Sequence, residues 1–200
     1  MKLLLNESWQ PDADEALYGE GGFYEAADTY AQAGNVLRGL AEIGKIGWLP
    51  RWLDVGCGDG ALVEQLRAIG FDAEGYDPIT RPDYPEGPYD MAISVHVLEH
   101  VADPIEFIDF MKHEIADHGY ICIVCHNVIG RPNVRARKPW HKWFFGRNLM
   151  TLLKARGFDI IGRITWGGYP APRKVWQEWV NQARKRLGLG DVQMVIGRRG

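Results

Sequence analysis

The sequence predicts an α/β fold: a doubly wound, Rossmann-like sheet that is mostly parallel, with helices on both faces and an antiparallel last strand. Strand-like apolar runs alternate with segments of helical periodicity along most of the 200 residues, at the spacing of βαβ units. The first strand of this alternation runs into a glycine-rich turn followed by a helix, and the next strand ends at an acidic residue. Both features are typical of sheets that bind a ligand at the carboxyl ends of their strands.

Local patterns predict the elements in order. Apolar residues at helical spacing indicate a helix over 25–43, and Pro50 ends that region. A helix over 61–69 is closed by Gly70. Asp103 and Pro104, an N-cap and a proline at the first helical position, start a helix that runs to about residue 117. Strands are predicted at 51–55, 71–76, 89–95, 120–125, 158–166 and 192–196, and further helices at 148–156 and 173–187.

The composition excludes several classes of protein. The chain is 46% hydrophobic and 24% charged, which excludes a disordered, collagen-like or disulfide-rich chain. Neither a secretory signal nor an apolar run long enough to span a membrane occurs, so we expect a cytoplasmic protein. Cys122 and Cys125 are three residues apart on a predicted strand and point to opposite faces, so we expect no metal site there.

The formal net charge of −3 conceals two halves of opposite charge. Residues 1–128 carry seven basic and 23 acidic side chains, a net charge of −16, and residues 129–200 carry 16 basic and three acidic ones, a net charge of +13. Six of the basic residues lie between Arg131 and Arg147, among four tryptophans and phenylalanines. The sequence therefore predicts either a solvated basic surface or a basic rim that favours an anionic ligand. Nucleic acid is not favoured, because no RNA-binding signature accompanies the run.

Three glycines follow the first strand of the alternation. Gly56, Gly58 and Gly60 let the backbone turn tightly before a helix whose N-terminus presents free N–H groups. Asp77 ends the next strand, 21 positions after Gly56, where a carboxylate accepts hydrogen bonds from a ribose. The spacing alone leaves the cofactor open, because Gly56, Gly58 and Ala61 also fit the dinucleotide fingerprint.

Two longer stretches resemble a known family. Residues 53–60, Leu-Asp-Val-Gly-Cys-Gly-Asp-Gly, are similar to the first motif of class I S-adenosylmethionine-dependent methyltransferases, and residues 89–104 are similar to that family's fourth-strand region. Residues 140–158 resemble a stretch of its small bacterial members. The resemblance implies S-adenosylmethionine as cofactor. The cofactor-binding residues that it implies are Asp54, Gly56, Cys57, Gly58, Gly60, Asp77, Pro78, Ser94, Val95 and His96.

The sequence departs from the family in one place. Only 12 residues, 78–89, separate Asp77 from Asp90, which is too short for the usual helix and edge strand. We therefore expect that edge strand to be missing or vestigial, with Tyr84 or Ile79 covering the adenine. A single domain over 1–200 is predicted, with an N-terminal helical lid (1–45, with Tyr18, Phe23 and Tyr24), a cofactor-binding half (46–126) and a basic acceptor-side half (127–200).

Three histidines are candidates for catalysis. His96 follows the predicted strand 89–95, His126 follows the strand 120–125, and His141 lies in the basic aromatic loop. Each is a candidate base or a histidine that orients the substrate, whereas His100 is expected to be structural. The resulting hypothesis is in-line methyl transfer to a small or carrier-linked, anionic acceptor. The alternatives are an NAD-dependent oxidoreductase on a Rossmann-type sheet and a non-catalytic cofactor-binding homologue.

Overall fold

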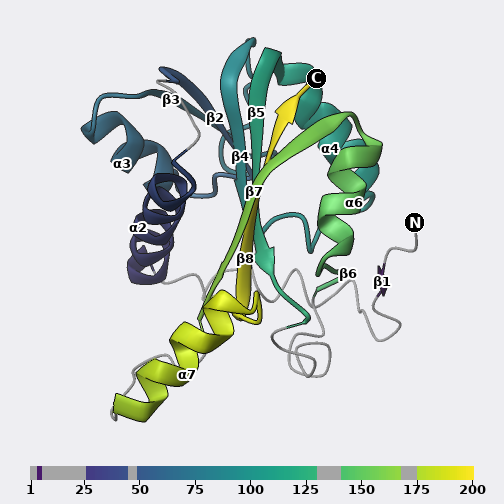
Figure 1. The fold of residues 1–200 in the computed structure, drawn as a ribbon. Coiled ribbons are helices and arrows are strands. Elements are labelled where there is room, and N and C mark those ends of the chain that lie inside the picture. Colours follow the sequence, from purple (N-terminus) through teal and green to yellow (C-terminus); the bar gives the residue numbers. More distant parts are fainter. Residues whose placement is uncertain (1–3, 6–25, 45–48, 130–140, 168–174) are drawn as a thin grey trace.

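The structure, a computed structural model, describes residues 4–5, 26–44, 49–129, 141–167 and 175–200, and of 4–5, 26–33 and 175–178 the backbone alone. A six-stranded sheet runs through its centre, in the order β3-β2-β4-β5-β8-β7 (Figure 1). Its strands are β2 (Arg51–Val55), β3 (Asp72–Tyr76), β4 (Tyr89–Val95), β5 (Ile115–His126), β7 (Phe158–Trp166) and β8 (Val192–Arg199). The pairs β2–β3, β2–β4 and β4–β5 are parallel, whereas β8 is antiparallel to both of its neighbours. The predicted fold class, including the antiparallel last strand, is confirmed.

The edge of the sheet at β3 is reduced, as the sequence predicts. Among the described residues, no strand pairs with the outer side of β3, and residues 77–88 contain only an isolated bridge between Asp77 and Arg81. This loop encloses a hollow of about 420 Å³ together with α3 (Ala61–Ala68) and β3. A short loop that folds back on itself thus takes the place of the missing edge strand.

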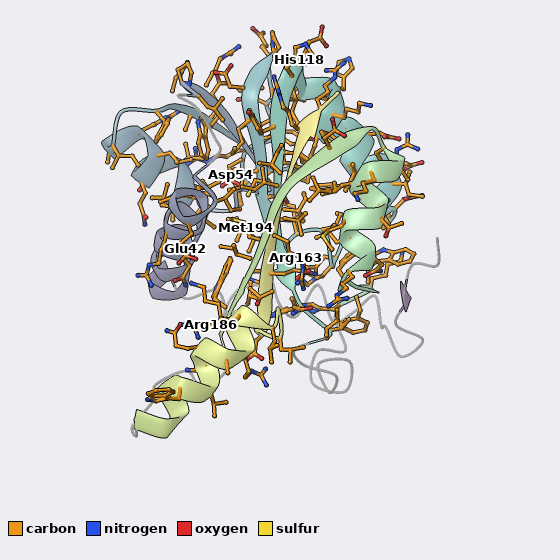
Figure 2. All side chains as sticks on the ribbon, in the orientation of Figure 1. Glu42, Asp54, His118, Arg163, Arg186 and Met194 are labelled. Atoms are coloured by element: carbon orange, nitrogen blue, oxygen red, sulfur yellow. The ribbon has the colours of Figure 1, made fainter. Side chains whose placement is uncertain are left out.

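Helices cover both faces of the sheet and form two cores. α2 (Ala26–Ile43) and α3 lie on one face, and α4 (Pro104–Glu114) and α6 (Asn148–Ala155) lie on the other (Figure 1). Met194 of β8 packs against Gly39 of α2, where an added methyl group would lie 2.6 Å from the Met194 methyl. Figure 2 shows Met194 in the middle of the sheet, beside α2. Because alternate residues of each strand face opposite helices, the strands that carry the site are fixed from both sides.

Two predicted boundaries differ from the structure. α4 begins as predicted, with the Asp103 carboxylate accepting hydrogen bonds from the N–H groups of Ile105 and Glu106. It ends at Glu114, however, and not near residue 117. Ile115 is 1% exposed and pairs with Tyr89, so residues 115–119 extend β5. Burial of Ile115 in the core overrides the local helical pattern at this point.

The predicted helix 173–187 carries an apolar stripe whose spacing leaves open whether it packs in the core; its described members do not. α7 (Val175–Arg186) projects from the body of the protein (Figure 1). Trp179 is 74% exposed, and Leu187, just after the helix, is 66% exposed. Two strands of two residues each, β1 (Leu4–Leu5) and β6 (Trp143–Phe144), form a further small antiparallel pair that the sequence does not predict.

Some of the described basic residues of the second half form ion pairs with acidic residues. Arg156 donates two hydrogen bonds to the Asp109 carboxylate of α4, and Lys185 of α7 forms an ion pair of 2.7 Å with Glu42 of α2. Arg184 pairs with Asp191. Some of the basic charges of the second half are thus neutralised by acidic residues of the first half. The predicted basic rim at Arg135, Arg137 and Lys138 lies outside the described residues.

Candidate active site at the carboxyl ends of the strands

The glycine loop after β2 is held by its own backbone. The N–H groups of Gly56 and Cys57 both donate to the Tyr76 carbonyl oxygen, at 2.7 and 3.2 Å. Gly56 has a φ of 78°, and a Cβ on it would lie 2.3 Å from Val97 Cγ2. Only glycine fits here, because the conformation is left-handed and the loop after β4 comes this close. Gly58 also has a positive φ, but space remains open around it.

Asp77 lies against this loop, at the end of β3. Its Oδ2 accepts a hydrogen bond of 3.3 Å from the Gly58 N–H, and its Oδ1 accepts from the N–H groups of Ile79 and Thr80. The Thr80 hydroxyl donates to the Gly58 carbonyl oxygen at 2.6 Å. The structure therefore brings Asp77 to the glycine loop, as expected for a ribose-binding carboxylate. Of the two predicted adenine covers, Ile79 lies beside Asp77 and is 75% exposed, whereas Tyr84 contacts Tyr76 and Phe110.

The cofactor end of the site, defined here as the glycine loop with Asp54, Asp59 and Asp77, is rich in negative charge. Burial, the charge of Asp77 and, to a smaller extent, that of Asp59 together raise the pKa of Asp54 to about 7, against the opposite effect of Arg81. The Arg81 guanidinium packs over Gly60 and donates to the Asp59 carbonyl oxygen. Three carboxylates thus face one guanidinium around an open glycine turn. A cationic ligand fits this surrounding and an anionic diphosphate does not.

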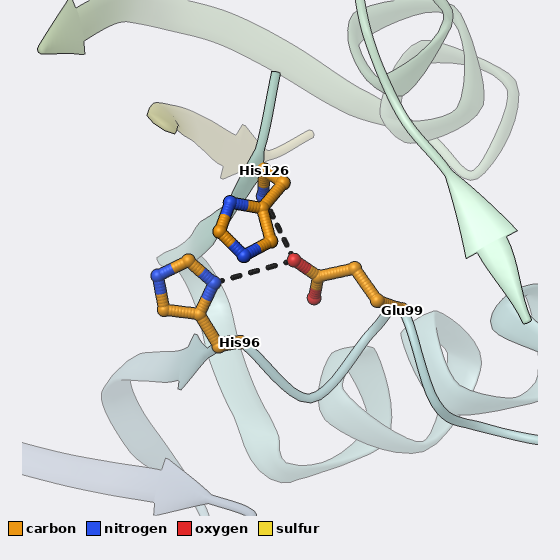
Figure 3. Close-up of side chains that lie close together, drawn as sticks. All are labelled: His96, Glu99 and His126. Carbon is orange, nitrogen blue, oxygen red and sulfur yellow. Dashed lines mark hydrogen bonds and ion pairs between the residues drawn. The ribbon is translucent and has the colours of Figure 1, made fainter. Parts of the chain in front are cut away.

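Glu99 occupies the opposite end, in the turn after β4. It is fully buried, and its Oε1 accepts hydrogen bonds from the His126 backbone N–H at 2.8 Å and from His96 Nδ1 at 3.3 Å (Figure 3). Its backbone carbonyl oxygen accepts from the N–H groups of Lys142 and Trp143. The imidazoles of His96, His141 and His126 hold the pKa of the Glu99 carboxyl below its usual range, against the opposite effect of its burial. Glu99 is therefore a carboxylate at neutral pH.

Four imidazoles gather around this carboxylate. We call His96, Glu99, His100, His126 and His141 the histidine cluster. The His126 ring lies 4.7 Å from the His96 ring and 5.0 Å from the His141 ring, and the His141 ring lies 4.8 Å from that of His100. His96 has a φ of 57°, an uncommon conformation for a residue other than glycine. The backbone after β4 thus turns sharply where the His96 imidazole meets Glu99, and such strain is characteristic of functional sites.

The three histidines predicted as catalytic are therefore neighbours in space, although they come from three separate segments. Glu99, which organises them, is absent from the predicted site. Its signal in the sequence is its position three residues after His96, directly before His100. Of the remaining predicted residues, Ser94 is 1% exposed and Val95 packs on the α2–α3 face. The predicted lid residues Tyr18, Phe23 and Tyr24 lie outside the described residues.

The three cysteine thiols are not ionised, although Cys57 belongs to the glycine loop. Cys122 and Cys125 are fully buried within β5, and burial raises the pKa of each thiol. Burial and the Asp54 charge raise the pKa of Cys57 to about 12. All three are free thiols and stay protonated at neutral pH.

A family model decides which cofactor the glycine loop serves. A model described as a methyltransferase domain matches residues 18–162, most of the chain. The chain belongs to the methyltransferase domain family. The predicted cofactor, S-adenosylmethionine, is thereby confirmed at the level of the family. The family model gives no support to the alternative of a dinucleotide cofactor. The charges agree with this result, because S-adenosylmethionine carries a sulfonium and an ammonium that suit a loop lined by carboxylates.

Curated relatives of the chain are also methyltransferases. A ubiquinone biosynthesis O-methyltransferase of Roseobacter denitrificans is 27% identical over 152 residues, 56% of this chain and 61% of the relative. A protein of the same name from Caulobacter sp. is 31% identical over 103 residues, 38% of this chain and 41% of the relative. The chain thus spans less than two thirds of the length of these curated relatives.

Solved structures confirm the fold of this methyltransferase domain. An S-adenosylmethionine-dependent methyltransferase from Archaeoglobus fulgidus has a TM-score of 0.60 at 16% identity, over 94% of this chain and 99% of that chain. Magnesium protoporphyrin IX methyltransferase from Synechocystis PCC 6803, solved with bound S-adenosylhomocysteine, has a TM-score of 0.58 at 15% identity, over 94% of each chain. No described helix of the present domain is both long and apolar enough to cross a membrane.

Proposed function

We propose that this domain transfers the methyl group of S-adenosylmethionine to an oxygen atom of a small-molecule acceptor. The donor occupies the cofactor end, and the acceptor lies against the histidine cluster. The observation that carries the proposal is the pairing of His96 with buried Glu99 directly after β4. The two curated relatives support oxygen as the acceptor atom, since both are named O-methyltransferases.

The chemistry of the step explains why such a pair is useful. S-adenosylmethionine supplies an activated methyl group on a sulfonium. An oxygen lone pair of the acceptor attacks the methyl carbon, the carbon–sulfur bond breaks, and the sulfur keeps the bonding electrons as a neutral thioether. The hydroxyl proton has to leave, because a neutral hydroxyl is a weak nucleophile.

His96 is the proposed base. In the tautomer assigned from its contact with Glu99, Nδ1 carries the proton and donates to Oε1, so Nε2 holds a free lone pair. The side chain of His96 is 16% exposed, whereas that of Glu99 is 1% exposed. His96 therefore lies nearer to a ligand, and Glu99 acts through it as a positioning residue that stabilises the imidazolium. His126 and His141 pack behind His96 and orient the acceptor.

The first experiment separates the donor from the acceptor. Calorimetric titration with S-adenosylhomocysteine and, separately, with NAD tests the cofactor, and binding of NAD alone would contradict the proposal. A transfer assay with methyl-labelled S-adenosylmethionine and matched phenols, carboxylic acids and amines then tests the acceptor atom. We expect labelled product from the phenols. Cofactor binding without transfer to any class would instead indicate a non-catalytic homologue.

The predicted anionic acceptor remains part of this proposal. Its test is a variant in which Arg135, Arg137 and Lys138 are all changed to Gln. Selective loss of transfer to anionic phenols, with neutral phenols and cofactor binding unaffected, would support a basic rim. Equal activity on both classes would assign these charges to the solvent.

A further inference from the structure

The proton transfer proposed above leaves one feature of the histidine cluster unused. Glu99 is fully buried, and its Oε2 has no hydrogen-bond partner among the residues that the structure describes. Buried carboxylate oxygens are nearly always bonded to a donor or to a metal ion. Contacts to Oε1 alone, from the His96 imidazole and the His126 amide, are therefore an incomplete environment for this carboxylate.

Three side chains present ligand atoms to the same small space. His96, Glu99 and His126 each offer one atom, and these atoms all lie within 4.8 Å of one another. Figure 3 shows the imidazoles and the carboxylate converging, with a ring nitrogen of His126 directed between the other two groups. Bonds of about 2.0–2.2 Å to an ion place its ligands roughly 3–3.6 Å apart. The separation of 3.3 Å between His96 Nδ1 and Glu99 Oε1 already has this length.

We propose that His96, Glu99 and His126 bind a divalent transition-metal ion. Two imidazole nitrogens and one carboxylate oxygen form a ligand set that suits Zn²⁺, Fe²⁺ or Co²⁺ better than Mg²⁺, which prefers oxygen ligands and keeps several waters. Three protein ligands also leave coordination positions open, as catalytic metal sites require. The sequence-based expectation of no metal site concerns only the cysteine pair, whose members point to opposite faces of a strand.

The surroundings of the triad support a built site and not a chance encounter. The amides of Lys142 and Trp143 hold the Glu99 backbone, and the His126 amide donates to the Glu99 carboxylate. The His141 ring packs on the His126 ring. His96 is kept in its left-handed conformation by a hydrogen bond of 2.9 Å from its N–H to the Val124 carbonyl oxygen. Such outer contacts fix the orientation of ligands in metal sites.

The ion would change the role of His96 in the proposed reaction, and this part of the inference rests on the proposed function. His96 becomes a ligand through Nδ1 and its proton moves from Nδ1 to Nε2, so the imidazole stays neutral and the acceptor hydroxyl proton passes to solvent. The ion then acts as a Lewis acid that lowers the pKa of the acceptor hydroxyl. The methyl transfer itself is unchanged.

Binding is tested without reference to activity. The full chain is stripped with a chelator, dialysed, and titrated with Co²⁺ while its visible absorption is recorded, and with Zn²⁺ in a calorimeter. We expect one ion per chain. Glu99→Gln and His126→Gln should each weaken binding at least ~10-fold, because even an outer-shell partner is worth that much. His118→Gln is the matched control: His118 is exposed, has a φ of 64°, and lies at the far end of the sheet (Figure 2).

Each outcome decides the proposal. Equal Co²⁺ spectra in the wild type, Glu99→Gln and His118→Gln would overturn it, as would a folded wild type that binds neither ion. If the variants fail to fold, X-ray absorption of the Zn²⁺-loaded wild type counts the imidazole ligands of the ion. Two imidazole ligands would support the site, and the absence of any imidazole ligand would refute it. Methyl transfer measured on the same preparations separates the two proposals. A specific Co²⁺ spectrum without transfer contradicts the proposed function, and transfer that survives stripping, without a Co²⁺ spectrum, contradicts the metal site.

Discussion

The cofactor end and the histidine cluster lie at the same edge of one sheet, but they are built by different means. The glycine loop is held by main-chain hydrogen bonds between residues of β2, β3 and the turns that follow them. The histidine cluster is assembled from side chains of the turn after β4, the end of β5 and the segment at 141–143. A main-chain site tolerates changes of side chain except where space is lacking, whereas a side-chain site depends on each member.

The electrostatics of the two ends also differ. At the cofactor end, burial and neighbouring carboxylates raise the pKa of Asp54 to about 7. At the histidine cluster, imidazoles lower the pKa of the equally buried Glu99. At the first end the carboxylates outnumber the single guanidinium of Arg81, whereas at the second end imidazoles surround one carboxylate. The comparison therefore assigns the cationic donor to one end and proton chemistry to the other.

The largest expected effect lies at the histidine cluster. His96→Gln should lower kcat by ~10²–10⁴-fold, the usual contribution of a positioned base or its equivalent. Affinity for S-adenosylhomocysteine, measured by calorimetry, should fall far less than kcat, because His96 is not part of the main-chain loop. His118→Gln should match the wild type. Equal loss of cofactor affinity and kcat in His96→Gln would show that the two ends are not separate.

The next effect lies at the cofactor end. Asp77→Ala removes a carboxylate that bonds Gly58 and stands where a ribose is expected, and hydrogen bonds to charged groups contribute about 1.5–3 kcal/mol. Affinity for S-adenosylhomocysteine should therefore fall roughly 10–100-fold. Asp77→Asn, which keeps the shape of the side chain, should lose less. Unchanged affinity in Asp77→Ala would remove the ribose assignment.

A smaller effect measures how closely the two ends approach. Gly56→Ala places a methyl group 2.3 Å from Val97 Cγ2 at a φ of 78°, and strain with overpacking costs about 1–3 kcal/mol of unfolding free energy. Urea denaturation followed by tryptophan fluorescence measures the loss. In the Val97→Ala background the clash is relieved but the φ strain remains. Adding Gly56→Ala to Val97→Ala should therefore cost less unfolding free energy than Gly56→Ala costs in the wild type, but still more than zero.

The mildest effect is a pH dependence of cofactor binding. In the proposed binding mode, S-adenosylhomocysteine brings an ammonium toward Asp54, which favours the carboxylate and lowers its pKa from about 7. Below pH 7, binding must first remove that proton, so affinity should fall by at most about tenfold per pH unit. Above pH 7 it should be constant. Calorimetry between pH 5.5 and 8.5 should show this slope in the wild type and none in Asp54→Asn.

The pH dependence of the free energy of unfolding gives an independent test of the pKa of Asp54. With a folded pKa near 7 and an unfolded value of 3.8, the folded protein binds more protons at pH values between these two. The contribution of Asp54 to the free energy of unfolding therefore decreases as the pH rises through this window. Asp54→Asn should gain stability relative to the wild type from pH 5 to pH 8. A constant difference would mean that Asp54 is charged throughout.

Particular residues show how far sequence reasoning extends. Gly56, Gly58 and Asp77 were predictable because local order along the chain dictates the turn after a strand and the end of the next one. Glu99 was not, because nothing local distinguishes a buried carboxylate in a turn from an exposed one. Ile115 shows the same limit in the fold, since a strand partner 26 positions away ended a helix that its own pattern would continue.

By itself, the sequence determined the alternation of strands and helices, the reduced sheet edge after Asp77, and the glycine loop with its acidic partner. These features follow from periodicity, chain length and backbone conformation, which are local properties. The tertiary structure alone decided that His96, His126 and His141 are neighbours, that Glu99 joins them, and that the exposed stripe of α7 faces solvent. The reason is that burial and proximity depend on which segments pack together, and no single segment encodes its distant neighbours.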